Sequence, residues 1–159
     1  LIFVQENFEN PLAFAVDTYY NRPQNVSAYN LAAQQNYLGG ICSMLEGKGN
    51  VIVGQSGGPT AVINFSLAGV YKTAKDRGAS KVYGMVHGIQ GLLQERYVDL
   101  SEHIKNELDI ELLKRTPSAY LGSCRFKLPD ISEDREIYDR IFEILNRLEI
   151  EYFFYIGGF

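Results

Sequence analysis

Residues 50–64, which read NVIVGQSGGPTAVIN, combine residue types that could hold a phosphate group. A short β-branched run enters a turn of small residues, and the turn opens directly into a helical pattern. Such a turn points backbone N–H groups and the positive end of a helix at one place, which favours an anion. Gly57 and Gly58 have no Cβ atom that would hold a ligand away from the backbone. Pro59 fits a first helical position, where its missing N–H costs nothing.

The spacing of this turn matches neither of two common phosphate-binding motifs. No Gly-Lys-Ser or Gly-Lys-Thr follows as in a Walker A loop, and the pattern is not GxGxxG. A strand, a glycine pair and a helix also form ordinary βα turns. The phosphate interpretation therefore depends on other segments of the chain.

Length, composition and charge limit the classes to which the chain can belong. Its 159 residues can form a domain with a core, and 46% hydrophobic and 21% charged residues are typical of globular proteins. A net charge of −4 without a basic stripe argues against a nucleic-acid partner, and no apolar run approaches the length of a membrane span. Cys42 and Cys124 lack metal-ligand spacing and suggest a reducing compartment. We therefore expect a cytoplasmic protein that binds neither nucleic acid nor membrane.

The composition of the chain changes near residue 44. Residues 1–43 are rich in Asn, Gln and Tyr, contain few charged residues and no lysine, and show no clear period. Met44 begins a sequence typical of an enzyme that opens with a strand, and the codons of Gly39 and Gly40 could form a ribosome-binding sequence. We expect residues 1–43 to be translated upstream sequence, with a genuine N-terminal extension as the alternative, and residues 44–159 to be the working domain.

The second part alternates between strand and helix patterns. Apolar runs predict buried strands over 50–54, 81–85 and 151–156, and helical spacing predicts helices over 60–77, 101–114 and 132–148, with a short helical segment after residue 87. This alternation predicts an α/β, Rossmann-like fold with a mostly parallel sheet and flanking helices. Ligands of such sheets bind outside the carboxyl ends of the strands.

The predicted helices also have expected faces and caps. In the helix over 60–77, Val62, Phe65 and Val70 follow helical spacing. Ser101 is expected to cap a helix that buries Ile104, Leu108 and Leu112, and Ser132 is expected to cap the last helix. In that last helix, Glu136 with Arg140 and Glu143 with Arg147 are i,i+4 pairs typical of a solvated face.

Four separate motifs together resemble one enzyme family. They are residues 54–64, YGMVHGIQGL at 83–92, RTPSAYLGSCRFKL at 115–128 and YFFYIGG at 152–158. In this order they resemble the phosphofructokinase family, and the wording of the loops is most similar to its pyrophosphate-dependent branch. The resemblance covers about residues 48–158 and is specific because four motifs agree, whereas any one alone would be weak.

The resemblance implies a glycolytic phosphotransferase. The implied reaction transfers a phosphoryl group from pyrophosphate, with Mg²⁺, to the 1-hydroxyl of fructose 6-phosphate, giving fructose 1,6-bisphosphate. It also implies a homo-oligomer at full length. Two alternatives stay open: the same reaction with ATP as donor, and a non-catalytic phosphate- or nucleotide-binding domain. The segment 122–126, which a generic binding domain does not need, favours the enzyme.

The resemblance also implies roles for individual residues. The residues expected to contact the donor phosphates are Gly57, Gly58, Thr60, Arg125, Gly157 and Gly158, with Ser123 and Lys127 in support. Arg125 would neutralise charge near the transferred group, a role that suits a permanently charged planar fork. An arginine on a loop could instead pair with a nearby carboxylate. Gly157 and Gly158 would open the family's Gly-Gly-Asp segment, which touches the donor phosphates and the metal.

The chain departs from the family pattern after this glycine pair. Phe159 stands where the family has an acidic or similar polar residue, and the family's Thr-x-Asp-Asn-Asp segment with the general base would lie beyond residue 159. The same holds for the sugar-phosphate residues. We therefore expect a truncated N-terminal part of the domain, without a catalytic residue or metal ligand of its own and inactive alone. A three-stranded fragment would also expose a sheet edge, so we expect self-association.

Overall fold

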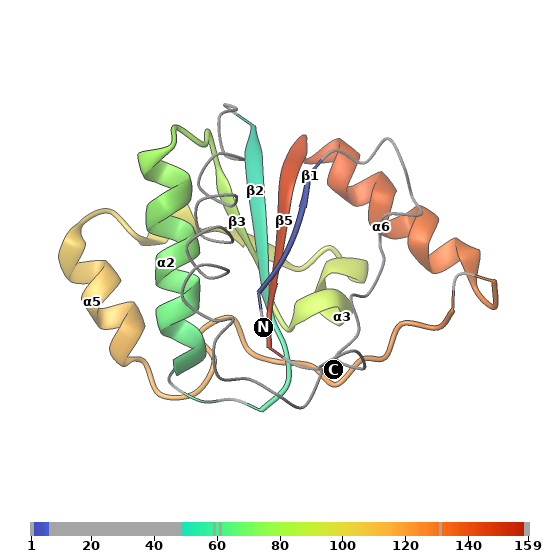
Figure 1. The fold of residues 1–159 in the computed structure, drawn as a ribbon, viewed down its shortest axis with the longest axis horizontal. Helices are drawn as coiled ribbons and strands as arrows, with labels where there is room; N and C mark the ends of the chain where they lie inside the picture. The colour runs from blue at the N-terminus through green and yellow to red at the C-terminus, as the bar shows by residue number, and fades with distance from the viewer. Residues whose placement is uncertain (1, 7–48, 59, 61, 131, 158–159) are drawn as a thin grey trace, which may run out of the picture.

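The computed structural model describes residues 2–6, 49–58, 60, 62–130 and 132–157 (Figure 1). In chain order, the elements are β1 (Ile2–Glu6), β2 (Asn50–Gln55), α2 (Val62–Asp76), β3 (Val82–Met85), α3 (Gly88–Leu93), β4 (Tyr97–Asp99), α4 (Leu100–His103), α5 (Glu107–Arg115), α6 (Arg135–Arg147) and β5 (Ile150–Ile156). The described strands and helices alternate along most of the chain, as the sequence predicts.

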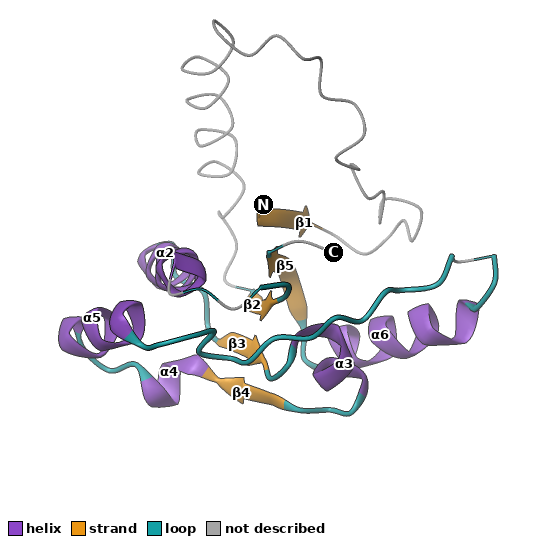
Figure 2. Cartoon of the chain, turned by 90° about the horizontal axis from the view of Figure 1, so that it is seen from below, coloured by secondary structure: helices purple, strands orange, loops and turns teal. Residues whose placement is uncertain are grey.

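The described strands form one five-stranded sheet in the order β1-β5-β2-β3-β4. The three central strands are parallel, since β2 pairs with β5 on one side and with β3 on the other. The two edge strands are antiparallel to their neighbours, β1 to β5 and β4 to β3. Figure 2 shows α2 and α5 on one face of the sheet and α3 and α6 on the other. This arrangement confirms the predicted α/β fold with a mostly parallel sheet and flanking helices.

The alternation of side chains along the central strands divides the core into two clusters. Val51 and Val53 of β2 pack on the α2 face, where Leu67 is fully buried. Ile52 points to the opposite face and packs in a cluster with Ile144 of α6. Because both faces are covered, the strands are nearly all apolar, as in other buried parallel sheets.

The prediction of a single helix over 101–114 is wrong. The helix α4 ends at His103, its C-cap Ile104 has extended backbone angles, and α5 starts after Asn106. Asn106 and Asp109 form a reciprocal capping box that satisfies the first N–H groups of α5. The break changes the buried face, so that Leu108 and Leu112 are 65% and 57% exposed. Ile104 is buried as predicted, and Ile110 and Leu113 provide the core contacts of α5.

Two other local predictions also differ from the structure. In α2, Val70 is buried, but Val62 and Phe65 are exposed, and the buried side instead includes Ile63 and Leu67. The N-cap of α6 is Asp134, not Ser132, because the Asp134 carboxylate accepts a hydrogen bond from the Ile137 N–H.

The ion pairs of α6 also differ from the expected i,i+4 pattern. Arg140 pairs with Glu143 at 2.7 Å and also with Glu95, in the turn after α3. Arg147 pairs with the second carboxylate oxygen of Glu95 at 2.7 Å. Arg140 and Arg147 therefore join α6 to the α3–β4 turn, whereas Arg135 forms an i,i+4 pair with Asp139.

The sheet has more strands than the three that the sequence predicts. The strand β4 is short and only half-buried, so its three residues carry no clear pattern. The strand β1 pairs with the outer edge of β5, with Val4 opposite Phe154. The edge that was expected to be exposed is therefore covered over residues 152–156. Among the described residues, no helix is both long and apolar enough to cross a membrane.

Candidate functional site

The candidate site lies where three segments meet at the carboxyl ends of β2 and β5. The first is the turn from β2 into α2, and the second is the end of β5 at Gly157. The third is the segment 116–130, which runs from α5 to α6 and crosses below the strand ends (Figure 1). A site in this position agrees with the general rule for parallel α/β sheets.

The turn after β2 is fixed by backbone hydrogen bonds to both other segments. The N–H of Ser56 donates to the carbonyl of Ile156 at 2.9 Å, and the N–H of Gly57 donates to the carbonyl of Cys124 at 3.4 Å. Gly57 has a φ of 80°, a conformation that glycine adopts without strain. The glycine therefore allows the chain to turn directly from the strand toward the start of α2.

Side-chain hydroxyl groups join the same two loops a second time. The Ser123 hydroxyl donates to the carbonyl of Gly57 at 2.6 Å. In the opposite direction, the Ser56 hydroxyl donates to the carbonyl of Cys124 at 3.3 Å. The turn at residues 56–58, called the glycine turn below, and the segment around Ser123 are thus held together by hydrogen bonds in both directions. Ser123 therefore helps to hold this turn in place.

Gly157 closes the third side of the site. It has a φ of 129°, and a Cβ atom at this position would overlap the carbonyl oxygen of Ser56. Only glycine therefore allows the end of β5 to pass this closely to the turn. Gly158, the other half of the predicted pair, lies outside the described residues.

A pocket of about 220 Å³ opens between the turn and the N-terminal end of α2. It is lined by Ser56, Gly58, Thr60, Val62, Ile63, Ser66, Ile156 and Gly157. The first N–H groups of a helix have no partner within the helix, and the helix dipole is positive at this end. The pocket therefore suits a small anion. It brings together Gly58, Thr60 and Gly157 of the predicted site.

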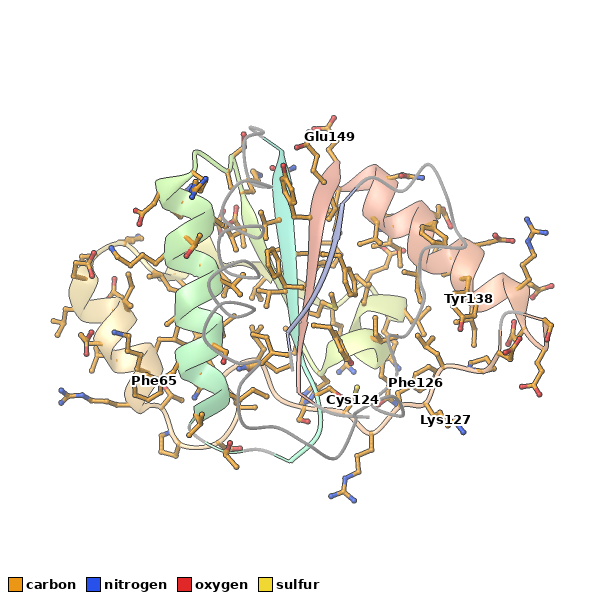
Figure 3. All side chains as sticks on the ribbon, in the orientation of Figure 1. Phe65, Cys124, Phe126, Lys127, Tyr138 and Glu149 are labelled. Carbon is orange, nitrogen blue, oxygen red and sulfur yellow. The ribbon has the colours of Figure 1, made fainter. Side chains whose placement is uncertain are left out.

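The two predicted basic residues belong to the segment that is hydrogen-bonded to the glycine turn, but they do not line the pocket. Arg125 and Lys127 follow Cys124, and both are exposed. Figure 3 shows Phe126 and Lys127 further along the segment toward α6, with Lys127 pointing away from the sheet. Within the described part of the chain, neither residue forms an ion pair. The described carboxylates therefore do not provide the alternative ion pair for Arg125.

Tyr155, the penultimate residue of strand β5, packs against these loops and was not predicted as part of the site. Its hydroxyl accepts a hydrogen bond from the Ile89 N–H at 3.3 Å and lies 3.6 Å from the Cys124 sulfur. Burial raises the pKa of Tyr155 to about 12, and the contact with Cys124 adds to the increase. The hydroxyl is therefore neutral at physiological pH and acts as part of the support beneath the site.

Gln55 and Asn64 are two further residues that sequence reasoning missed. Both are fully buried at 0% exposure, although they stand in an apolar strand and on the buried side of α2. A buried amide in such a position needs hydrogen-bond partners, and this requirement is the signal that could have identified them.

Metal binding would require ligand side chains that lie close together. Within the described ranges, no group of three His, Cys, Asp or Glu side chains comes together as a metal site. The described residues therefore do not build a complete metal cage, whereas Mg²⁺ beside phosphates commonly takes one or two carboxylates and completes its shell with phosphate oxygens and water.

The chain is similar to one known protein family and to several relatives. The model of the family described as Phosphofructokinase matches residues 50–159. The chain is 47% identical over 112 residues to pyrophosphate–fructose 6-phosphate 1-phosphotransferase of Rhodospirillum rubrum. It is 42% identical over 111 residues to the protein of the same name from Halomonas elongata. These matches cover 70% and 69% of this chain but 26% of each relative.

A solved structure gives the same result for the fold. The crystal structure of pyrophosphate-dependent phosphofructokinase from Nitrosospira multiformis matches with a TM-score of 0.62 and 38% identity. The match covers 70% of this chain and 27% of that one. The chain therefore spans about a quarter of the length of the relatives that it matches.

Proposed function

This chain belongs to the phosphofructokinase family, and from that premise we propose that it forms the donor-phosphate part of a pyrophosphate-dependent 6-phosphofructokinase. The proposed reaction moves a phosphoryl group from pyrophosphate to fructose 6-phosphate and gives fructose 1,6-bisphosphate. The names of the two relatives support pyrophosphate as the donor. The protein as a whole would act in glycolysis.

One structural observation carries this proposal. The glycine turn, the segment around Ser123 and the end of β5 meet at the N-terminal end of the 15-residue helix α2. Phosphoryl transfer depends mainly on positioning and on stabilising negative charge. A turn held in this way keeps the first N–H groups of α2 in place, where they can bind phosphate oxygens without reorganising during the reaction.

The proposed residues divide this work between them. Gly57, Gly58 and Gly157 let the backbone approach the donor, and Thr60 offers a hydroxyl at the start of α2. Arg125 carries a positive charge that reaches the pocket only if its side chain turns toward it, and Lys127 adds to the positive field. Gly158 is proposed to act beside Gly157.

The metal and the other partners belong to the proposal as well. Mg²⁺ would supply charge neutralisation at the donor phosphates when bound, and its protein ligands are proposed to lie in the family's segment beyond residue 159. The family's general base and the fructose 6-phosphate site are also proposed to lie elsewhere in the full enzyme. A cytoplasmic location and a homo-oligomeric full-length form stay predictions, as does the absence of nucleic-acid and membrane partners.

A titration with pyrophosphate tests the proposal directly. Pyrophosphate, with and without Mg²⁺, is added to the ¹⁵N-labelled 159-residue chain, and the backbone amide resonances are followed by NMR. We expect saturable shifts at Gly57, Gly58 and Ser123. ATP added in the same way tests the alternative donor. Saturable shifts with ATP but none with pyrophosphate would overturn the assignment of the donor.

Gly58 offers a variant that separates binding from folding. A Cβ atom at Gly58 would meet no other atom within 4 Å, so Gly58→Ala should fold normally. It would nevertheless stand between the backbone and the phosphate, and we expect roughly tenfold weaker pyrophosphate binding. Gly69→Ala is the matched control, because Gly69 lies in α2 with equally open surroundings. Equal affinities for the two variants would contradict the proposal.

A further inference from the structure

Gln55 and Asn64 form a buried pair of amides whose hydrogen bonds are almost all used. The Asn64 amide nitrogen donates to the carbonyls of Thr116 at 2.8 Å and Ser118 at 2.7 Å. Its oxygen accepts from the Tyr120 N–H at 2.8 Å and from the Gln55 amide nitrogen at 3.1 Å. An asparagine side chain offers two donors and an acceptor with two lone pairs. Asn64 therefore has no unused hydrogen-bonding capacity.

Gln55 extends this network to the next residue of the same segment. Its oxygen accepts from the Leu121 N–H at 2.8 Å, and its nitrogen also donates to the Ile63 carbonyl at 3.3 Å. The pair thus links the end of β2 and the start of α2 to four backbone positions between 116 and 121. These positions immediately precede Gly122 and Ser123, and the Ser123 hydroxyl contacts the glycine turn.

We propose that Gln55 and Asn64 are positioning residues, which set the 122–125 segment in register with the glycine turn and so shape the donor-phosphate pocket. This inference rests on the proposed function for its ligand. Ser123 bonds to the turn through its hydroxyl, and Cys124 through its carbonyl. These contacts require the preceding residues to hold the 122–125 segment at hydrogen-bonding distance from the glycine turn.

The chemistry of the network explains why both positions carry amides. Two carbonyls and two N–H groups of the 116–121 segment face the pair, so the pair must supply donors and acceptors together. A carboxylate at either position would accept only, and it would face the backbone carbonyls with a buried negative charge. An apolar side chain would leave the Leu121 or Tyr120 N–H buried without a partner.

The network also lies apart from the surfaces that a ligand would touch. Both side chains are fully buried, and neither lines the pocket. An effect of these residues on pyrophosphate binding would therefore have to pass through the backbone, either of the 116–125 segment or of the adjoining pocket residues Ser56 and Ile63. This separates a positioning role from direct contact.

The test compares Gln55→Met with Tyr71→Phe in the full 159-residue chain. Gln55→Met removes the acceptor for Leu121 together with the donor to Asn64 and the Ile63 carbonyl, and it keeps a side chain of similar length. Tyr71→Phe is a control for lost stability, because it removes a buried hydroxyl that donates to the Ile104 carbonyl at 2.8 Å, away from the site. Pyrophosphate affinity, unfolding by urea and the ligand-free amide resonances of Ser123 and Arg125 are measured for each.

We expect Gln55→Met to shift the ligand-free resonances of Ser123 and Arg125 and to weaken pyrophosphate binding about tenfold. Tyr71→Phe should lose stability without either effect. Asn64→Asp should show the same shifts more strongly; if it does not fold, Gln55→Met still decides the question.

Two outcomes would separate this inference from the proposed function. If the unsubstituted chain does not bind pyrophosphate, the proposed function fails, and the ligand-free resonances alone judge the positioning role. If Gln55→Met loses only as much affinity as Tyr71→Phe and leaves the resonances of Ser123 and Arg125 unchanged, the positioning role is overturned.

Discussion

The imidazole ring of His87 occupies the space that a Cβ atom on Gly122 would need. Such an atom would lie 2.5 Å from the His87 Nδ1, and Gly122 has a φ of 75°. The backbone N–H of His87 donates to the Leu121 carbonyl at 2.8 Å, and the ring Nδ1 lies 3.4 Å from the Ser123 carbonyl oxygen. His87, in the turn before α3, therefore packs against the 121–123 segment and holds it in place.

This relationship predicts that Gly122→Ala will be costly. The substitution combines a strained backbone with the contact to His87, and we expect a loss of stability of at least about 1 kcal/mol. Gly78→Ala is the matched control, since Gly78 has a φ of 88° but no atom within 4 Å of the added Cβ. Urea unfolding of both variants measures the difference.

The double variant His87→Ala with Gly122→Ala separates strain from overlap. Removing the ring should recover the part of the loss that comes from contact and leave the part that comes from backbone strain. If Gly122→Ala and Gly78→Ala cost the same, the contact with His87 contributes nothing. Because Gly122 precedes Ser123, only Gly122→Ala should also weaken pyrophosphate binding.

The sequence predicts the parts of the fold that carry strong periodic patterns. The strands at 50–54, 81–85 and 151–156 are confirmed because continuous apolar runs are typical of buried parallel strands. Short or half-buried segments lack such a signal, and β4 is therefore missed. The helices differ from expectation for another reason, since Leu108 of α5 and Phe65 of α2 are apolar and fit a helical period yet point to solvent.

The residues of the candidate site also divide into those that the sequence reveals and those that it does not. Its glycines and the segment 122–126 could be recognised from the residues in sequence, although their roles stay predictions. The supports beneath them could not, because His87, Tyr155 and Asn64 act through contacts with residues distant in the chain. Such contacts depend on the tertiary fold, which local patterns do not specify.

The pairing of β1 with β5 predicts an effect on self-association. Deleting residues 1–6 would expose the backbone groups of β5 opposite Ile2–Glu6, and free strand edges favour pairing between molecules. We expect the deletion variant to form concentration-dependent oligomers in sedimentation velocity experiments. An unchanged sedimentation profile would show that this pairing does not protect the sheet edge.

Glu95 predicts a change of stability at acidic pH. Its hydrogen bond to Arg147, together with the positive charge of Arg147 and Arg140, lowers the pKa of the Glu95 carboxyl. The stabilisation is therefore complete above the pKa of an unfolded glutamate, about 4.3, and is lost as the pH falls through the lower folded value. Glu95→Gln should flatten this acidic decline in urea midpoints.

The matched control for this prediction lies on the same helix. Glu136 of α6 forms no ion pair among the described residues, so Glu136→Gln should leave the acidic decline as it is. The Glu95 pairs are exposed to solvent, and their effect should shrink at high salt. If both variants show the same pH dependence, the pairs between the α3–β4 turn and α6 do not stabilise the fold.

Tyr155 predicts the opposite trend at alkaline pH. Burial favours the neutral hydroxyl in the folded state and raises its pKa to about 12, whereas an unfolded tyrosine titrates near 10. The stabilisation is complete below about pH 10 and declines above it by about 1 kcal/mol per pH unit, because the unfolded chain releases the proton first. Tyr155→Phe should remove this decline in urea unfolding between roughly pH 9 and 11.

The same variant should also lose stability at neutral pH. Without the hydroxyl, the buried Ile89 N–H has lost the acceptor that lies 3.3 Å away, which costs about 1–3 kcal/mol. Tyr120→Phe, which removes an exposed hydroxyl, is the matched control. Two measurements therefore judge Tyr155: a lower midpoint at neutral pH and a weaker decline at high pH. An alkaline decline as steep in Tyr155→Phe as in Tyr120→Phe would mean that other groups cause it.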